Sequence, residues 1–203
     1  MDDESDPFEP AHALERALQR LEHAQATGDL ASLLYCALDV RLCIERQLFV
    51  YLVLIKSAEI PAKLERLYSA TDLRKAILTE EPNFYKKIEF FAIFMEFLPY
   101  PGPVVVPDLD VLSDGYGRLN NYLHAPKRPS RTSRDAKWWA ELEACLKSTM
   151  AHLRDILSAP TGNIELNDQG SILFQAFLSG EKTADEVRTL LKDNFKTSPM
   201  RRV

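Results

Sequence analysis

Apolar positions recur at helical spacing from the start of the chain. The first such run begins at Pro10 and is followed by Gly28, where a C-terminal glycine commonly stands. Asp29 is placed to cap a second run, 30–55, whose apolar stripe widens until the second half is apolar nearly all round. The pattern therefore predicts an N-terminal helix and, after it, the long central helix of a bundle.

Prolines and capping residues mark the next elements. Pro61 is expected to start a short helix, Thr71 to cap another, and Pro82 to occupy the first turn of a phenylalanine-rich helix over 84–97. We assign that helix to the core, and a dimer surface is the alternative. The prolines at 99–103 predict an extended connector, because each proline pushes the residue before it out of the α region.

Two further helices follow this connector. One is predicted from Pro107 to about His124 and another from Trp138 to about Leu157, with a polar, basic loop over 127–133 between them. These helices complete the elements that we assign to the bundle.

The last forty residues have a different pattern. Ile164–Leu166 reads as a strand, Asn167–Gly170 as a turn, and Ser171–Leu178 as an apolar run that fits either helix or strand. Thr183-Ala-Asp-Glu186 is a capping box that opens a final helix. We predict an all-α helical bundle at 10–158, preceded by an acidic flexible tail at 1–9 and followed by a small C-terminal appendage at 159–203, with a short strand as a candidate element of the appendage.

Composition and charge narrow the function classes. The 203 residues carry a net charge of −5, which argues against nucleic-acid binding over the whole surface. Residues 114–137 nevertheless sum to +4, so the remainder sums to −9. A docked polyanion and a solvated basic loop without a ligand are both compatible with this local balance.

Motifs for cofactors, metals and membranes are missing from the sequence. It contains no GxGxxG, GxxxxGK[ST], HExxH or GxSxG pattern, and its longest apolar run, Leu48–Ile55, is far too short to span a bilayer. Cys36 and Cys43 lie about 10 Å apart along one helix and cannot bridge each other. We expect a cytoplasmic protein with core cysteines, no cofactor, no metal and no membrane association.

One segment, 107–124, has a face that could carry chemistry. On a helical wheel its leucines form a core stripe together with Tyr116, and Asn121 points most directly away from that stripe. Gly117 leaves a hollow there that a phosphate or a partner backbone could approach. The residues on this outward arc, all polar or glycine, are Ser113, Asp114, Gly117, Arg118, Asn121 and His124.

Structural interpretations exist for the same residues. His124 near a helix end could interact with the last carbonyls, and Asp114 with Arg118 could be an exposed ion pair four residues apart. On the central helix, a second group of charges favours a structural network: Arg41, Glu45 and Arg46.

The segment Arg118-Leu-Asn-Asn-Tyr-Leu-His124 resembles the Arg-x4-6-His motif of the HEPN superfamily, whose domains are all-α bundles with a long early apolar helix. The resemblance implies a metal-independent endoribonuclease of toxin–antitoxin or defence type. It also implies that His124 transfers a proton at the RNA 2′-hydroxyl or the leaving 5′-oxygen, and that Arg118 stabilises phosphate charge. Members commonly form homodimers in which two motif helices build one cleft.

Two details qualify the match. Arg16 and His23 also fit the spacing, but they lie on the first helix, whereas the motif of the family lies late in the bundle. Family members commonly carry Asn, Asp or His after the arginine, and this chain has Leu119. Asn120 or Asn121 is the candidate replacement, and RNA binding without cleavage is the alternative.

The sequence thus yields two function hypotheses. The first is a HEPN-like ribonuclease or RNA-binding homodimer with Arg118 and His124 as the catalytic pair and Asn121 as the orienting neighbour. Its expected RNA-binding residues are Lys127, Arg128, Arg131 and Arg134. The second is a catalytically silent helical interaction module whose polar arc contacts an antitoxin or a regulatory protein; a small-molecule enzyme is disfavoured because no second acid/base cluster is present.

Overall fold

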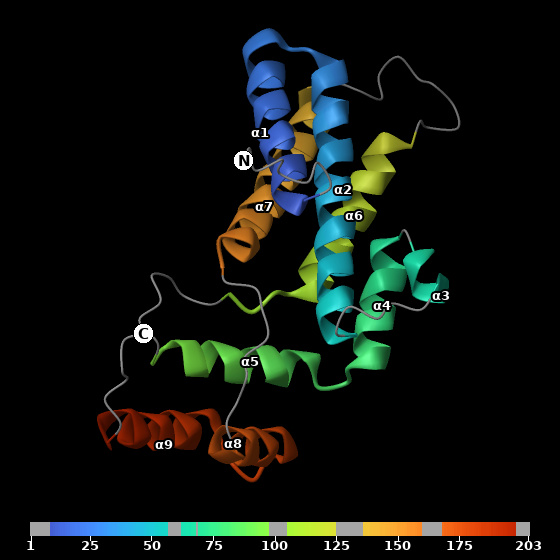
Figure 1. The fold of residues 1–203 in the computed structure, drawn as a ribbon. Helices are drawn as coiled ribbons and strands as arrows, with labels where there is room; N and C mark the ends of the chain where they lie inside the picture. The colour runs from blue at the N-terminus through green and yellow to red at the C-terminus, as the bar shows by residue number, and fades with distance from the viewer. Residues whose placement is uncertain are drawn as a thin grey trace, which may run out of the picture. The chain divides into compact units, whose positions relative to one another are not determined.

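A computed structural model of the chain describes residues 9–56, 62–67, 69–97, 105–124, 136–159 and 168–197. Within these ranges every regular element is an α-helix and none is a strand, so the predicted all-α class is confirmed (Figure 1). The chain divides into two compact units. One comprises Met1–Glu80 and Asp108–Ser158, and the other comprises Glu81–Pro107 and Ala159–Val203.

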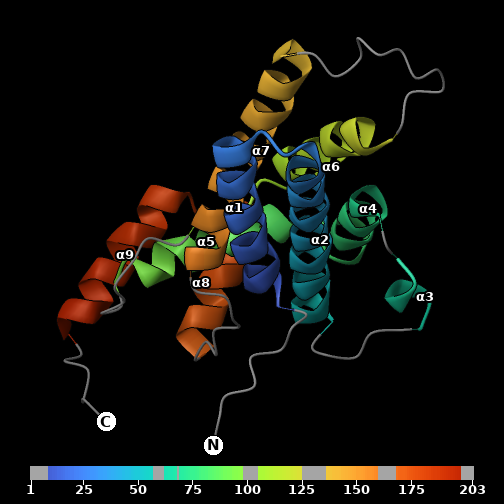
Figure 2. The same cartoon turned by 90° about the horizontal axis from the view of Figure 1, so that it is seen from above.

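The first unit is built around α2, Leu30–Ile55, which packs against four other helices (Figures 1 and 2). Those four helices are α1 (Pro10–Thr27), α4 (Ala70–Glu80), α6 (Leu109–Leu123) and α7 (Ala136–Ser158). The short helix α3 (Ala62–Glu65) precedes α4 in the same unit. The predicted central position of the 30–55 helix is therefore confirmed.

The connection between α1 and α2 follows the two signals in the sequence. Gly28 adopts a left-handed conformation with φ 72°, and its N–H donates to the carbonyl of Ala24 at 2.8 Å. The Asp29 carboxylate accepts hydrogen bonds from the backbone N–H groups of Ala31 at 3.1 Å and Ser32 at 2.9 Å. These bonds satisfy N–H groups that the start of α2 would otherwise leave unpaired.

Small side chains let α1 lie close to α2. Ala13, Ala17 and Ala24 of α1 are fully buried, while α2 contributes the larger side chains of the core. The cysteines are buried and unpaired, and burial raises the pKa of Cys36 and of Cys43 to about 12. Their predicted role as core residues is confirmed. The largest buried side chains of α2 are Leu33, Ile44, Leu48 and Leu52.

The second unit consists of α5 (Phe84–Met95), α8 (Asp168–Ser179) and α9 (Ala184–Thr197). The ring of Phe90 lies 4.9 Å from that of Phe174 and 5.7 Å from that of Phe177. The core assignment of the phenylalanine-rich helix is thus confirmed for Phe90. The buried members of this cluster are Phe90, Ile93, Phe177, Val187 and Leu191.

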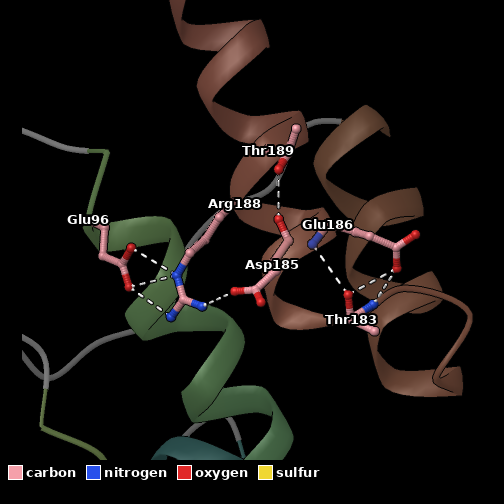
Figure 3. Close-up of polar contacts among 6 residues, drawn as sticks. All are labelled: Glu96, Thr183, Asp185, Glu186, Arg188 and Thr189. Atoms are coloured by element: carbon pink, nitrogen blue, oxygen red, sulfur yellow. Dashed lines mark hydrogen bonds and ion pairs between the residues drawn. The ribbon is translucent and has the colours of Figure 1, made fainter.

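Polar contacts join α9 to α5 at the edge of this cluster. Arg188 lies between two carboxylates, with Nε 3.1 Å from Oε2 of Glu96 and Nη1 3.2 Å from Oδ1 of Asp185 (Figure 3). In the same unit, Lys86 Nζ of α5 donates to the carbonyl of Leu178 of α8 at 2.9 Å. These contacts are exposed, so they orient the helices more than they stabilise them.

The turn between α8 and α9 contains the predicted capping box. The Thr183 N–H donates to Oε2 of Glu186 at 2.8 Å, and the Glu186 N–H donates to Oγ1 of Thr183 at 3.3 Å (Figure 3). Gly180, with φ 83°, provides the left-handed residue after α8. The apolar run 171–178, which the sequence left open between helix and strand, is helical.

Three local predictions are wrong by a few residues. Helix α4 begins before Thr71, because the Ser69 hydroxyl accepts the Asp72 N–H at 3.1 Å and so acts as the cap. Pro82 precedes the first turn of α5, whose N-cap is Asn83. Gly170 lies inside the first turn of α8 instead of ending a turn, because the apolar side chains after it pack in the second unit.

The division into units also differs from the one expected at residue 158. The segment Glu81–Pro107 groups with the C-terminal helices, because Phe90 and Ile93 of α5 share a core with α8 and α9. Residues 1–8 of the predicted tail, the proline connector at 99–103 and the candidate strand Ile164–Leu166 lie outside the described residues.

Candidate functional site

The candidate site lies on α6, which has a well-defined cap at each end. The Asp108 carboxylate accepts hydrogen bonds from the N–H groups of Asp110 at 2.9 Å and Val111 at 3.1 Å, so the helix starts two residues after the predicted Pro107. At the other end His124 is the C-cap, and its N–H donates to the carbonyl of Asn120 at 3.0 Å. The helix therefore ends where the sequence predicted.

The two faces of α6 differ as the helical wheel predicted. Leu112 and Leu119 are fully buried and Asn121 is exposed. Leu123 is only half-buried, because it is the last residue of the helix. Five of the six residues on the outward arc are exposed, with Ser113 half-buried: Asp114, Gly117, Arg118, Asn121 and His124.

On one flank of this face, α6 is held against α2 by Tyr116. Arg41 Nη2 donates to the Tyr116 hydroxyl at 2.8 Å, and the guanidinium carbon lies 4.6 Å from the centre of the tyrosine ring. Arg41 is also 3.4 Å from Oε1 of Glu45. Burial, and then the charge of Glu45, raise the pKa of Tyr116. The predicted Arg41–Glu45 contact is confirmed, and Tyr116 is the partner that sequence reasoning missed.

On the opposite flank, α6 approaches α7 closely at Gly115. A Cβ at this position would lie 3.1 Å from both Cγ2 and Oγ1 of Thr149. A Cβ at Gly117, on the outward arc, would meet nothing within 4 Å in the described part of the chain. The two glycines of α6 therefore have different roles: Gly115 permits helix packing, and Gly117 leaves the outward face open.

At its C-terminal end, α6 meets the first turn of α7 through an aromatic pair. The ring centres of Tyr122 and Trp138 are 5.7 Å apart, with an edge-to-face angle of 75°. Burial, followed by the charges of Glu141 and Cys145, raises the pKa of Tyr122, while the positive charge of Arg118 lowers it. Arg118 lies four residues, about one turn, before Tyr122 on α6.

The proposed catalytic residues share one exposed surface. Arg118 and His124 are six residues apart, which is about 9 Å along a helix axis, and Asn121 lies midway between them. Within the described residues no ion pair joins Arg118 to Asp114, so the structural interpretation of these two residues as a pair finds no support. The expected RNA-binding residues Lys127, Arg128, Arg131 and Arg134 lie outside the described residues.

The second match to the motif spacing has a structural explanation. Arg16 Nε lies 3.3 Å from Oδ1 of Asp39, and Arg20 Nε lies 2.7 Å from Oδ2 of the same carboxylate. The Asp39 side chain is only 9% exposed, so these arginines neutralise a buried charge between α1 and α2. Sequence reasoning missed Asp39. The signal that could have revealed it is its position as a charged residue among the apolar positions of α2.

The described residues contain no cluster of three or more His, Cys, Asp or Glu side chains arranged to hold a metal ion. Within the same ranges, none of the helices combines the length and apolar character that crossing a membrane requires. Comparisons with protein-family models, curated proteins and solved structures gave no match to this chain.

Proposed function

We propose that the chain is a HEPN-like, metal-independent endoribonuclease or RNA-binding protein of toxin–antitoxin or defence type that acts as a homodimer. Arg118 and His124 form its catalytic pair, and Asn121 orients the substrate between them. The observation that carries this proposal is the exposure of all three side chains on the outward arc of α6, while the opposite side of the same helix is buried.

The chemistry assigned to the arc uses proton transfer and charge stabilisation. The 2′-oxygen of the RNA attacks the adjacent phosphorus, a new P–O2′ bond forms, and the P–O5′ bond breaks. His124 serves in the transfer of a proton from the 2′-hydroxyl or to the leaving 5′-oxygen, and Arg118 binds the non-bridging oxygens. The products are a 2′,3′-cyclic phosphate and a free 5′-hydroxyl.

A homodimer supplies what one arc lacks. The reaction removes one proton and donates another, and one chain offers a single histidine on the arc. Two arcs facing each other bring two His124 side chains and two Arg118 side chains to one cleft. The open position at Gly117 lets a phosphate or the backbone of the second copy approach α6.

The basic residues that follow α6 in sequence bind the RNA backbone in this proposal. Arg128 and Arg131 contribute affinity more than chemistry, so changing both to glutamine weakens RNA binding and makes it less dependent on salt. Titration of a 2′-O-methyl oligonucleotide at several salt concentrations measures this. We expect the slope of log affinity against log salt concentration to fall by about 1 to 2, because binding releases fewer counterions when phosphate contacts are lost. An unchanged slope would remove these residues from the RNA site.

Cleavage of single-stranded RNA in EDTA tests the catalytic assignment. The wild type should produce 2′,3′-cyclic phosphate ends, and His124→Ala should cleave about 10² to 10⁴ times more slowly. The matched control is His23→Ala, because His23 completes the other Arg-x4-6-His spacing on α1 and is exposed. Equal loss in both variants, or equal cleavage by the wild type and His124→Ala, would contradict the assignment.

A catalytically silent interaction module is the second candidate, and Leu119 favours it. This residue follows the arginine of the motif and is fully buried, so the position does not place a polar group on the arc. Overexpression distinguishes the two candidates. A ribonuclease should arrest growth, and Arg118→Ala or His124→Ala should relieve the arrest. Growth unaffected by the wild type, together with no cleavage of several RNA substrates, would favour the silent module.

A further inference from the structure

The Tyr122–Trp138 pair differs in its setting from the aromatic contacts of Phe90. The Phe90 contacts belong to the core of the second unit, whereas both Tyr122 and Trp138 are partly exposed. Because both side chains are partly exposed, part of their aromatic surface is open to solvent next to the outward arc of α6.

Charged residues on both α6 and α7 lie beside this pair. Arg118 lies one turn before Tyr122 on α6 and acts on its hydroxyl. Glu141 is the carboxylate close to Tyr122, and Lys137 lies 3.9 Å from it. A ligand that combines negative charge with flat aromatic surfaces suits this environment.

We propose that Tyr122 and Trp138 form a stacking subsite for an unpaired RNA base beside Arg118, so that the substrate is read as a single strand. This inference rests on the proposed function and adds a specificity element to it. Bases of a duplex are stacked on one another and do not present their faces to a protein, whereas unpaired bases stack on aromatic side chains. Arg118 then holds the phosphate next to the stacked base.

Binding of a 2′-O-methyl oligoribonucleotide tests the subsite, because this probe lacks the 2′-hydroxyl nucleophile and survives the wild-type protein. Trp138→Leu should bind an unpaired probe about ten-fold more weakly than the wild type and a duplex of the same composition about equally. Trp138→Phe should retain most of the affinity, because phenylalanine keeps an aromatic face. If Trp138 only packed α6 against α7, Trp138→Leu would lower the affinity for both probes equally, and this result would contradict the subsite.

Trp139 offers the matched control. It is the next residue on α7, it is also partly exposed, and the chain has two tryptophans in all. Trp139→Leu should leave the affinity for the unpaired probe unchanged. In Trp139→Phe the fluorescence comes from Trp138 alone, and a stacked base should quench it, whereas inorganic phosphate should not.

The outcomes separate this inference from the function on which it rests. If the wild type binds and cleaves RNA while Trp138→Leu and Trp139→Leu behave alike, the subsite is wrong and the ribonuclease proposal stands. If Trp138→Leu binds the unpaired probe and the duplex probe more weakly by the same factor, the subsite is likewise wrong and the ribonuclease proposal stands. If the wild type neither binds nor cleaves any RNA, both proposals fail.

Discussion

Gly115 occupies a position where the neighbouring helix leaves little room for a side chain. A Cβ at this position would press against Cγ2 and Oγ1 of Thr149 on α7. Thr149 is itself buried, and its side chain is β-branched and therefore stiff. Gly117, two residues later on the exposed arc, has no such neighbour. The same residue type therefore serves packing at one position and openness at the other.

This contrast predicts opposite effects of alanine on the free energy of unfolding. Gly117→Ala should raise it by up to about 1 kcal/mol, because alanine is the better helix former. Gly115→Ala gains the same helix propensity but loses about 1 to 3 kcal/mol to overpacking against Thr149. Urea unfolding of the two variants measures the difference. A Gly115→Ala variant as stable as Gly117→Ala would show that Thr149 can move aside.

Residue by residue, the sequence predicted the orientation of α6 but not its partners. The burial of Leu112 and Leu119 and the exposure of Asn121 follow from helical periodicity, which is a local property. The contact of Arg41 with Tyr116 joins residues 75 positions apart. No periodicity or spacing encodes such a contact, because it depends on how two complete helices pack.

Elements were predictable where a short-range chemical signal sets their ends. Gly28 and Asp29 separate α1 from α2, and the Thr183–Glu186 box opens α9, as their sequences indicate. The start of α4 was predicted wrongly because Ser69, which caps the helix, stands two positions before Thr71 and is also able to cap. Which of the two residues caps α4 depends on where the helix begins once it is packed against its neighbours, and this is a tertiary effect.

The Glu186 cap predicts an acid-sensitive start of α9. Hydrogen bonds from the Thr183 N–H and hydroxyl lower the pKa of Glu186 below its ordinary value of 4.5. The stabilisation is therefore complete above that value and is lost as the pH falls through the lowered pKa of the folded state. Hydrogen exchange of the first α9 amides, followed from pH 6 downwards, should show progressive loss of protection at about the pH where the carboxylate titrates.

Glu186→Gln should remove this pH dependence, because glutamine accepts the same hydrogen bonds without titrating. Glu181→Gln is the control, since Glu181 is an exposed carboxylate five residues earlier that takes no part in the box. Protection that falls equally with pH in Glu186→Gln and in the wild type would assign the acid sensitivity to another group.

The whole molecule differs most from the expectation of a bundle with a separate appendage. The chain passes between the two units three times, because Glu81–Pro107 belongs with Ala159–Val203. The reason is the apolar face of α5, whose Phe90 and Ile93 are buried by residues of α8 and α9. Periodicity predicted that this face is buried, but it could not identify the segments that bury it.

Removal of residues 159–203 should therefore expose a core instead of trimming an appendage. Without Phe177, Val187 and Leu191, the apolar face of α5 loses its buried neighbours. The truncated chain should bind a hydrophobic dye and self-associate in light-scattering measurements. Adding Phe90→Ser and Ile93→Ser to the truncated chain should reduce both signals. A truncated chain that stays monomeric and binds no dye would contradict the shared core.

The shared core of α5, α8 and α9 also sets an order for the synthesis of this protein. Roughly seventy residues separate the end of α5 from the start of α8, so a ribosome adding about 5 to 20 residues per second needs about 4 to 15 s to produce the partners of Phe90. Helices α6 and α7 emerge during that interval and complete the helices of the first unit. The first unit can thus finish folding on the ribosome while the apolar face of α5 stays uncovered, so α5 is a site where a chaperone could bind the nascent chain.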